Sequence, residues 1–96
     1  MVDTELIEVN TGAALGIKIN LPNAPLLLIR AEKGYLTCGY FDRNTVEKMG
    51  DNAAIFSGVK SFKEILGSKP VFLSKGMRKQ GARLTMTGRD ILELLV

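Results

Sequence analysis

The sequence contains no histidine and no tryptophan, and it has one cysteine and three prolines among 96 residues. Histidine is the commonest metal ligand and the usual acid–base residue near neutral pH, so its absence removes the most frequent designs for both kinds of site. A zinc site would have to be built mostly from carboxylates. We therefore predict no metal site and no cofactor. The single cysteine, Cys38, cannot close an internal disulfide, which favours a reducing compartment.

Long apolar runs are missing as well. The run Leu26–Ile29 is soon followed by the charged residues Arg30, Glu32 and Lys33. It is therefore far shorter than the ~20 apolar residues of a membrane-spanning helix. The acidic N-terminus lacks the basic start and apolar stretch of a signal peptide. The composition, 46% apolar and 24% charged, is that of an ordinary globular protein. We expect one compact domain over residues 1–96, located in the cytoplasm and not in a membrane.

The first half of the sequence has the patterns of β-strands. Residues Leu15–Leu21 alternate between apolar and other side chains, which is typical of a half-buried strand, and Leu6–Val9 precedes them as another strand. The run Leu26–Ile29 is apolar on both faces, as expected of a central strand that is covered on each side. A hairpin whose Gly34 is able to adopt positive φ then leads into a strand over Tyr35–Phe41. The sequence predicts a meander of four antiparallel strands.

The second half has the patterns of short helices around one further strand. Asn44, Ser61 and Thr87 are each followed three residues later by an acidic residue, and this spacing predicts a capping box at the start of a helix. Ser74–Gln80 is a candidate for a fourth helix, and Ala53–Phe56 for a fifth strand. The expected fold class is α+β, with a mainly antiparallel sheet of about five strands and three to four short helices.

Three segments together are similar to a known family. They are Lys33–Tyr40, then Gly50–Ala54 with Gly58–Phe62, and finally Gly76–Asp90. In this order and spacing they resemble the YunC-like family, a small bacterial and archaeal domain family of unknown function. The resemblance runs from about Glu5 to Leu95 and implies an α+β fold that self-associates. It implies no activity, substrate or cofactor.

Cys38 is the strongest nucleophile in the sequence. A reactive thiolate needs a neighbour that stabilises its charge, and without histidine this would have to be Lys60, Arg43 or a helix end. Tyr40 and Asp51 complete the candidate catalytic residues. Unpaired cysteines are also among the most often buried residues and behave as small hydrophobes. We favour core packing for Cys38, and whether the protein is an enzyme stays open.

The segment from Gly58 to Ser61 is a candidate ligand-binding site. It leads into a predicted helix, and free amides at a helix start beside Lys60 can hold a phosphate or a carboxylate. Gly39, next to the cysteine, would allow a ligand to approach the backbone closely. Val59 separates the glycine from Lys60, so the Walker pattern is not met. A tight strand-to-helix turn capped by Ser61 is the alternative that we favour.

Basic residues gather in the second half of the chain. Residues 51–96 carry eight basic and four acidic side chains, whereas residues 1–50 carry five basic and six acidic ones. Six basic residues and no acidic one lie between Lys69 and Arg89, and the candidate nucleic-acid contacts among them are Lys75, Arg78, Lys79 and Arg83. No aromatic residue follows Phe72 to stack on bases. We favour a solvated surface, with weak nucleic-acid binding as the minority interpretation.

The apolar strand over Leu26–Ile29 also bears on assembly. A chain this short cannot cover both faces of such a strand well with three short helices, and a second subunit would supply the missing cover. We expect a homodimer. The preferred function is a non-catalytic, homo-oligomeric module that binds a small molecule or a protein partner. An enzyme that uses Cys38 as its nucleophile, or weak nucleic-acid binding through Lys69–Arg89, is the alternative.

Overall fold

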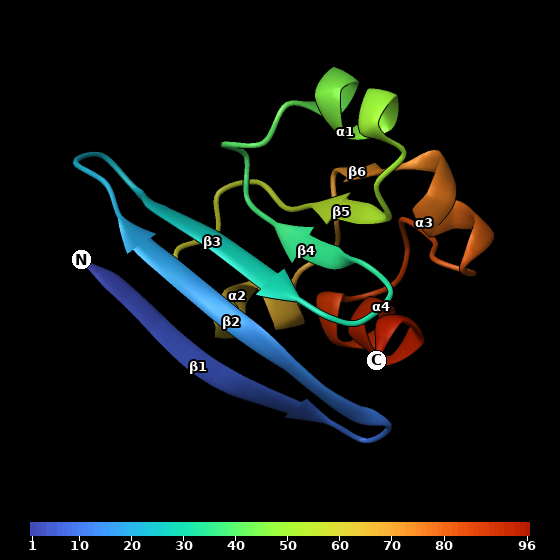
Figure 1. The fold of residues 1–96 in the computed structure, drawn as a ribbon, viewed down its shortest axis with the longest axis horizontal. Helices are drawn as coiled ribbons and strands as arrows, with labels where there is room; N and C mark the ends of the chain where they lie inside the picture. Colours follow the sequence, from blue (N-terminus) through green and yellow to red (C-terminus); the bar gives the residue numbers. More distant parts are fainter.

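The structure is a computed structural model that describes all residues from 1 to 96. It contains a six-stranded sheet in the order β1-β2-β3-β4-β5-β6 and four helices (Figure 1). The strands are β1 (Val2–Val9), β2 (Gly12–Asn20), β3 (Pro25–Arg30), β4 (Tyr35–Thr37), β5 (Ala53–Ile55) and β6 (Phe72–Leu73). The helices are α1 (Arg43–Met49), α2 (Phe62–Gly67), α3 (Lys75–Lys79) and α4 (Gly88–Leu95). The predicted α+β class is confirmed, and the two-residue β6 is one strand more than expected.

Most of the sheet is antiparallel, as predicted. Strands β1 to β4 form a meander in which each strand pairs with the next one along the chain. The exception is β5, which pairs parallel to β4 with Tyr35 opposite Ala53 and Thr37 opposite Ile55. Parallel neighbours need a long crossover between them. The segment 38–52, which contains α1, provides that crossover.

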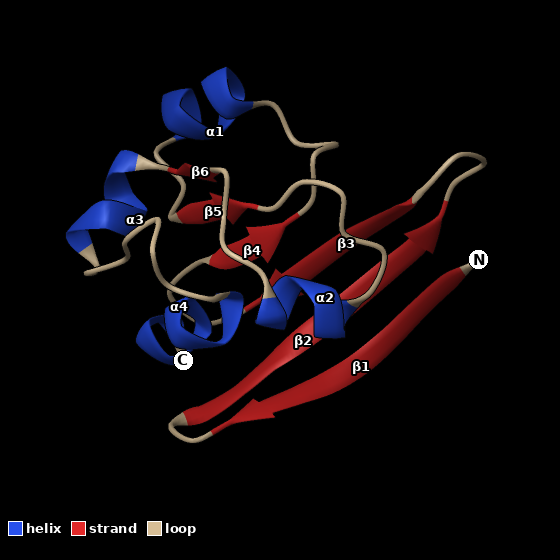
Figure 2. Cartoon of the chain, turned by 180° about the vertical axis from the view of Figure 1, so that it is seen from behind, coloured by secondary structure: helices blue, strands red, loops and turns tan.

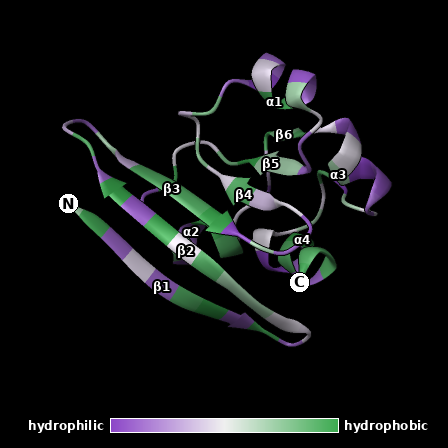
Figure 3. Cartoon of the chain, viewed as in Figure 1, coloured by the Kyte–Doolittle hydropathy of each residue, from purple (hydrophilic) through white to green (hydrophobic).

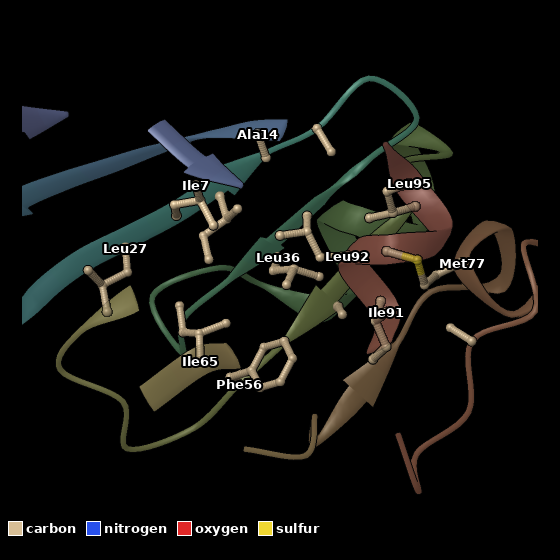
Figure 4. Packing of buried hydrophobic residues seen from close by; sticks show 14 of the residues in the cluster. Ile7, Ala14, Leu27, Leu36, Phe56, Ile65, Met77, Ile91, Leu92 and Leu95 are labelled. Carbon is tan, nitrogen blue, oxygen red and sulfur yellow. The ribbon is translucent and has the colours of Figure 1, made fainter. Parts of the chain in front are cut away.

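One face of the sheet packs against α2 and α4, which lie in front of the strands when the molecule is seen from behind (Figure 2). Leu27 and Leu36 from the sheet, Ile65 from α2 and Ile91 from α4 are fully buried between these layers (Figure 4). Burying such side chains stabilises the fold by about 1.5–3 kcal/mol each. None of the helices has the length and apolar character that crossing a membrane would require.

The other face of the sheet is covered only in part. The α1 segment lies over β4–β6, where Arg43 sits 5.5 Å above the Phe72 ring and Phe41 packs 5.8 Å from Tyr35. Over β1–β3 there is no such layer. The prediction that Leu26–Ile29 is covered on both faces is therefore wrong for one face. Leu27 and Ile29 are fully buried, whereas Leu26 and Leu28, which alternate with them along the strand, are half-buried.

The start of α1 differs from the prediction. The N-cap is Asp42 and not Asn44: the Asp42 carboxylate accepts hydrogen bonds from the Thr45 amide (2.9 Å) and the Thr45 hydroxyl (2.7 Å). These bonds favour the ionised carboxylate and lower the pKa of Asp42. Asp42 and Asn44 both have side chains that cap helices well. Asp42 begins the helix, and its carboxylate also accepts a hydrogen bond from the Thr45 hydroxyl.

The other helix starts follow the predicted residues. Ser61 accepts from the amide of Glu64 at 3.1 Å, but the Glu64 carboxylate reaches back to the amide of Lys60 and not to that of Ser61. At α4 both bonds of the capping box are formed between Thr87 and Asp90. The expected fourth helix is also present, as α3, with Ser74 as its N-cap.

Gly34 is required for a different reason from the one predicted. Positive φ occurs at Gly50, Gly58 and Gly81 but not at Gly34. A Cβ at Gly34 would overlap the carbonyl oxygen of Asn52 and lie 2.8 Å from its Cβ. The glycine therefore lets the β3–β4 turn approach the residue just before β5, next to the parallel strand pair.

Glu93 of α4 fastens the β1–β2 turn to the body of the protein. Its carboxylate accepts hydrogen bonds from the Asn10 amide (3.0 Å), the Thr11 amide (2.9 Å) and the Thr11 hydroxyl (2.6 Å). The bond from the Thr11 hydroxyl contributes most to lowering the pKa of Glu93 from its ordinary value of 4.5. The far end of the long β1–β2 hairpin is thus fixed by one ionised side chain.

Replacing Gly34 by alanine should destabilise the protein by more than about 2 kcal/mol, because backbone has to move to relieve the overlap with Asn52. Urea unfolding measures the change. Gly67→Ala is the matched control, since a Cβ there meets no atom within 4 Å and alanine is the better helix former. An equal loss of stability in both variants would contradict the close approach at Gly34.

Glu93→Gln should lower the melting temperature at pH 7, because an amide oxygen accepts hydrogen bonds less strongly than a carboxylate. The folded-state pKa of Glu93 lies below 4.5, so its charge stabilises the fold above pH 4.5 and this contribution disappears as the pH falls through the folded-state value. Thermal melts from pH 7 to pH 3 should show the gap between wild type and variant closing. Glu32→Gln, at an exposed position in the β3–β4 turn, should show no comparable gap.

Candidate functional site

The candidate site lies where β4 and β5 end. Because these two strands are parallel, their carboxyl ends meet at the same edge of the sheet, a place where open α/β sheets commonly bind ligands. Segments 38–40 and 58–60 follow the two strands, and the antiparallel β3 begins beside them. Together they enclose a pocket of about 270 Å³, lined by Ala24, Pro25, Cys38, Gly39, Tyr40, Gly58, Val59 and Lys60.

Cys38 forms part of the inner wall of this pocket. Its side chain is only 4% exposed and belongs to the hydrophobic core. The Sγ atom accepts a hydrogen bond from the Leu27 amide at 3.4 Å. The predicted strand over Tyr35–Phe41 ends at Thr37, so Cys38 lies at the start of a loop. Its sulfur fills the gap between that loop and β3.

Tyr40 forms part of the outer wall. Its side chain is 49% exposed, and its hydroxyl donates to the Ala24 carbonyl at 3.3 Å. This bond links the loop after β4 to the turn before β3. The aromatic ring therefore stands at the rim of the pocket, where it can contact a bound molecule while its hydroxyl is bonded to Ala24.

Lys60 supplies the only charged side chain of the pocket. Its backbone is held by the Glu64 carboxylate, which accepts from the Lys60 amide at 3.2 Å. Gly39 and Gly58 are exposed, and a Cβ at either would meet no protein atom within 4 Å. Gly58 has φ +71°, which glycine adopts without strain. Their amides donate no hydrogen bond within the protein, so both remain available to a ligand.

The other predicted site residues lie elsewhere. Ser61 is the N-cap of α2 and does not line the pocket. Asp51 lies at the opposite end of the parallel pair, where it accepts a hydrogen bond from the Tyr35 hydroxyl at 2.6 Å. Burial of Tyr35, and then this bond, raise the pKa of Tyr35 above its ordinary value. The structure therefore does not bring Asp51 together with Cys38.

The basic residues are likewise separate from the pocket. Lys75, Arg78 and Lys79 lie on or at the start of α3 and Arg83 in the loop after it, and all four are exposed. No three cysteine or acidic side chains lie close enough together to hold a metal ion. The basic stretch thus lines no part of the pocket that contains Cys38.

Two lining residues were missed by the sequence analysis. Ala24 and Pro25 come from the turn before β3, and neither carries a chemically active side chain. The antiparallel meander does place the start of β3 beside the end of β4. The sequence predicted that the fourth strand continues to Phe41, four residues beyond its actual end at Thr37. The contact between the loop after β4 and the turn before β3 could therefore not be predicted.

The thiol of Cys38 should react slowly in the folded protein because it is buried and already accepts a hydrogen bond. We expect iodoacetamide to alkylate it roughly 100-fold more slowly in native protein than in urea. Mass spectrometry of timed aliquots gives both rates. As a control, Ser57→Cys in a Cys38→Ala background places an exposed thiol in the neighbouring loop, and it should react rapidly in native buffer. Equally fast reaction of native Cys38 would contradict its burial.

Comparisons with known proteins agree on a family. Residues 37–95 match a family model described as a domain of unknown function, DUF1805. The chain is also similar to the crystal structure of TA1206, a protein of unknown function from Thermoplasma acidophilum, with 34% identity, a TM-score of 0.94 and coverage of 100% of this chain and 94% of that one. No curated protein matches. Since the family model spans more than half of the chain and the similar structure covers all of it, the protein belongs to the DUF1805 family, whose function is unknown.

Proposed function

We propose that this protein is a non-catalytic module that binds a small anionic molecule in the pocket at the carboxyl ends of β4 and β5. The observation that carries the proposal is the convergence of Cys38, Gly39 and Tyr40 with Gly58 and Lys60. The two segments that contain them are separated along the chain by the whole α1 crossover and β5.

The chemistry of the pocket favours an anion with an apolar body. Lys60 provides a positive charge, and the free amides of Gly39 and Gly58 provide donors of the kind that bind carboxylate and phosphate oxygens. Pro25 and Val59 offer apolar surface beside them. A volume of about 270 Å³ lies near the lower end of the ~300–1,000 Å³ typical of ligand pockets. The ligand class is therefore a small carboxylate or phosphate compound.

The same geometry argues against catalysis by the cysteine. A thiol nucleophile needs a base within hydrogen-bond reach, and the pocket contains Lys60 and Tyr40 but no acidic side chain. The Cys38 sulfur faces the Leu27 amide at 3.4 Å and would have to leave that bond to attack a substrate. An enzyme that uses Cys38 is the second candidate, and rapid alkylation of native Cys38 would favour it.

Two further aspects of the proposal come from the sequence. One free cysteine and a composition without long apolar runs support a cytoplasmic location. The segments Lys33–Tyr40, Gly50–Phe62 and Gly76–Asp90 support a place among the YunC-like proteins within the wider family. Nucleic-acid binding has less support, because the basic residues of α3 and its following loop have no aromatic neighbours in the sequence on which bases could stack.

The first experiment is native mass spectrometry of the protein purified from its own host without refolding. A reproducible additional mass would support ligand binding and identify a compound. The second experiment follows the amides of Gly39 and Gly58 by NMR during titration with butyrate, pyruvate and inorganic phosphate. We expect at least one of these probes to shift both amides, because both line the pocket and neither donates a hydrogen bond within the protein.

Substitutions inside and outside the pocket then test whether the probe binds there. Lys60→Met should weaken binding of the responding probe by roughly tenfold or more, as expected for a lost charge-assisted hydrogen bond. Lys69→Met is the matched control, because Lys69 is exposed and lines none of the pockets, and it should bind like wild type. The proposal is wrong if the protein carries no additional mass and no probe shifts either glycine amide. Equal weakening in both lysine variants would also contradict it.

A further inference from the structure

A second cavity lies where the crossover from β4 to β5 packs on the sheet. Figure 1 shows the chain leaving β4, passing through α1 and returning to β5, and Figure 3 shows that α1 carries hydrophilic as well as hydrophobic residues. The cavity has a volume of about 330 Å³. Its chemistry differs from that of the first pocket, because aromatic and acidic side chains line it and no basic one does. These aromatic and acidic residues are Tyr35, Tyr40, Phe41, Asp42 and Asp51.

Three aromatic rings contribute to the walls of the cavity. The rings of Tyr35 and Phe41 pack with their centroids 5.8 Å apart and their planes inclined by 53°, and both side chains are half-buried. The ring of Tyr40 is 49% exposed, and the buried Val46 of α1 adds apolar surface. The face of an aromatic ring is electron-rich and attracts a cation that lies within ~6 Å of the ring centre. The aromatic walls therefore favour a positively charged occupant.

Two carboxylates in the cavity wall each retain a free oxygen. Asp42 stands immediately before α1, and Asp51 follows the helix end by two residues. The Oδ2 atom of Asp42 accepts from the Thr45 amide and hydroxyl, and Oδ2 of Asp51 accepts from the Tyr35 hydroxyl at 2.6 Å. Neither Oδ1 atom accepts a hydrogen bond within the protein. Each carboxylate is thus held in place by one oxygen and offers the other to a ligand.

The cavity keeps its negative charge at neutral pH. The bonds from Thr45 lower the pKa of Asp42, so this carboxyl is ionised. Burial, and then the bond to Asp51, raise the pKa of Tyr35, so its hydroxyl stays protonated and continues to donate. Arg43, the basic residue next to Asp42, lies 5.5 Å above an aromatic ring of β6 and does not line the cavity. No basic side chain of the cavity wall neutralises the two carboxylates.

We propose that this cavity binds a small organic ammonium ion, either a protonated amine or a quaternary ammonium compound. The aromatic faces attract the positive charge, and the free carboxylate oxygens form charge-assisted hydrogen bonds with N–H groups where the ligand has them. A divalent metal ion fits less well, because it needs about six oxygen ligands and the acidic residues here do not form a group of three. The volume of about 330 Å³ is sufficient for a small ligand.

This ammonium site does not depend on the anion-binding pocket. Tyr40 is the one residue that lines both, whereas Lys60 does not line the ammonium site and neither Asp42 nor Asp51 lines the anion-binding pocket. The two sites have opposite charge and therefore select opposite ligands. Failure of one proposal leaves the other standing, provided that the probes are followed at residues that belong to a single site.

NMR titrations of wild-type protein with tetramethylammonium chloride and with butylammonium chloride test the site. We expect at least one of these probes to shift the ring resonances of Tyr35 and Phe41, which line the ammonium site and not the anion-binding pocket. tert-Butanol resembles tetramethylammonium in shape but has no charge, and sodium butyrate has the opposite charge to butylammonium. Neither control should shift the two rings at the same concentration, because the cavity selects positive charge.

Substitution of one carboxylate tests the role of its charge. Asp51→Asn should weaken binding of the responding probe by roughly tenfold, because the amide oxygen still accepts the bond from the Tyr35 hydroxyl but carries no charge. Asp3→Asn is the matched control: it makes the same change at an exposed residue of β1 that does not line the cavity, and it should bind like wild type.

Substitution of one ring tests the aromatic wall. Phe41→Leu should weaken binding by about fivefold, because leucine keeps the apolar surface but has no electron-rich face. Phe62→Leu is its control, since Phe62 is also half-buried but belongs to α2 and does not line the cavity. Circular dichroism melts establish that each variant is folded. The proposal is overturned if neither ammonium probe shifts the two rings of the wild type, or if tert-butanol shifts them equally. Equal weakening by a variant and its control would overturn it as well.

Discussion

The parallel pairing of β4 with β5 is the constraint on which the rest of the structure depends. Backbone bonds from Tyr35 to Asn52 (3.0 Å) and from Phe56 to Thr37 (2.8 Å) close the pair at its two ends. Parallel strands cannot be joined by a tight turn, so the chain has to leave the sheet and return, and α1 lies on that path. Both strands then end at the same edge. The pocket lies there, lined by residues of the two loops that follow the strands and of the start of β3.

The same pairing determines how the helices are distributed. The α1 crossover covers the face of β4–β6 on one side, and α2 and α4 cover the other side of the sheet. A chain of 96 residues has no helix left for the remaining face of β1–β3, which is why apolar side chains stay exposed there. Short chains bury a smaller share of their surface, and association with another subunit is one way to cover the remainder. The homodimer expected from the sequence is still a prediction, and this shortage of helices is its physical reason.

Local patterns in the sequence predicted the elements that depend on local interactions. The alternation in Leu15–Leu21 predicted β2, and the spacing of Thr87 and Asp90 predicted the capping box of α4. The predictions are wrong where a contact between residues far apart in the sequence determines the local structure. Gly34 was assigned to a turn with positive φ, but it is needed because Asn52 approaches it from the other end of the crossover. The fourth strand ends at Thr37 because its parallel partner is only three residues long, although its own sequence would allow it to continue.

The same holds for the candidate site: local patterns indicated its residues, but contacts between segments far apart in the sequence bring them together. Cys38 and Tyr40 were predicted as residues of a possible catalytic site, with Lys60 as one possible neighbour of the thiol. Gly39, Gly58 and Lys60 were predicted as ligand-binding residues. Alternation reveals that a segment is a strand but not whether its partner runs parallel, so the sequence alone could not show that these residues line one pocket. Once β4 and β5 are parallel, one pocket contains both, and the thiol becomes part of its buried wall. A lysine, two free glycine amides and apolar walls then describe a binding site better than a catalytic one.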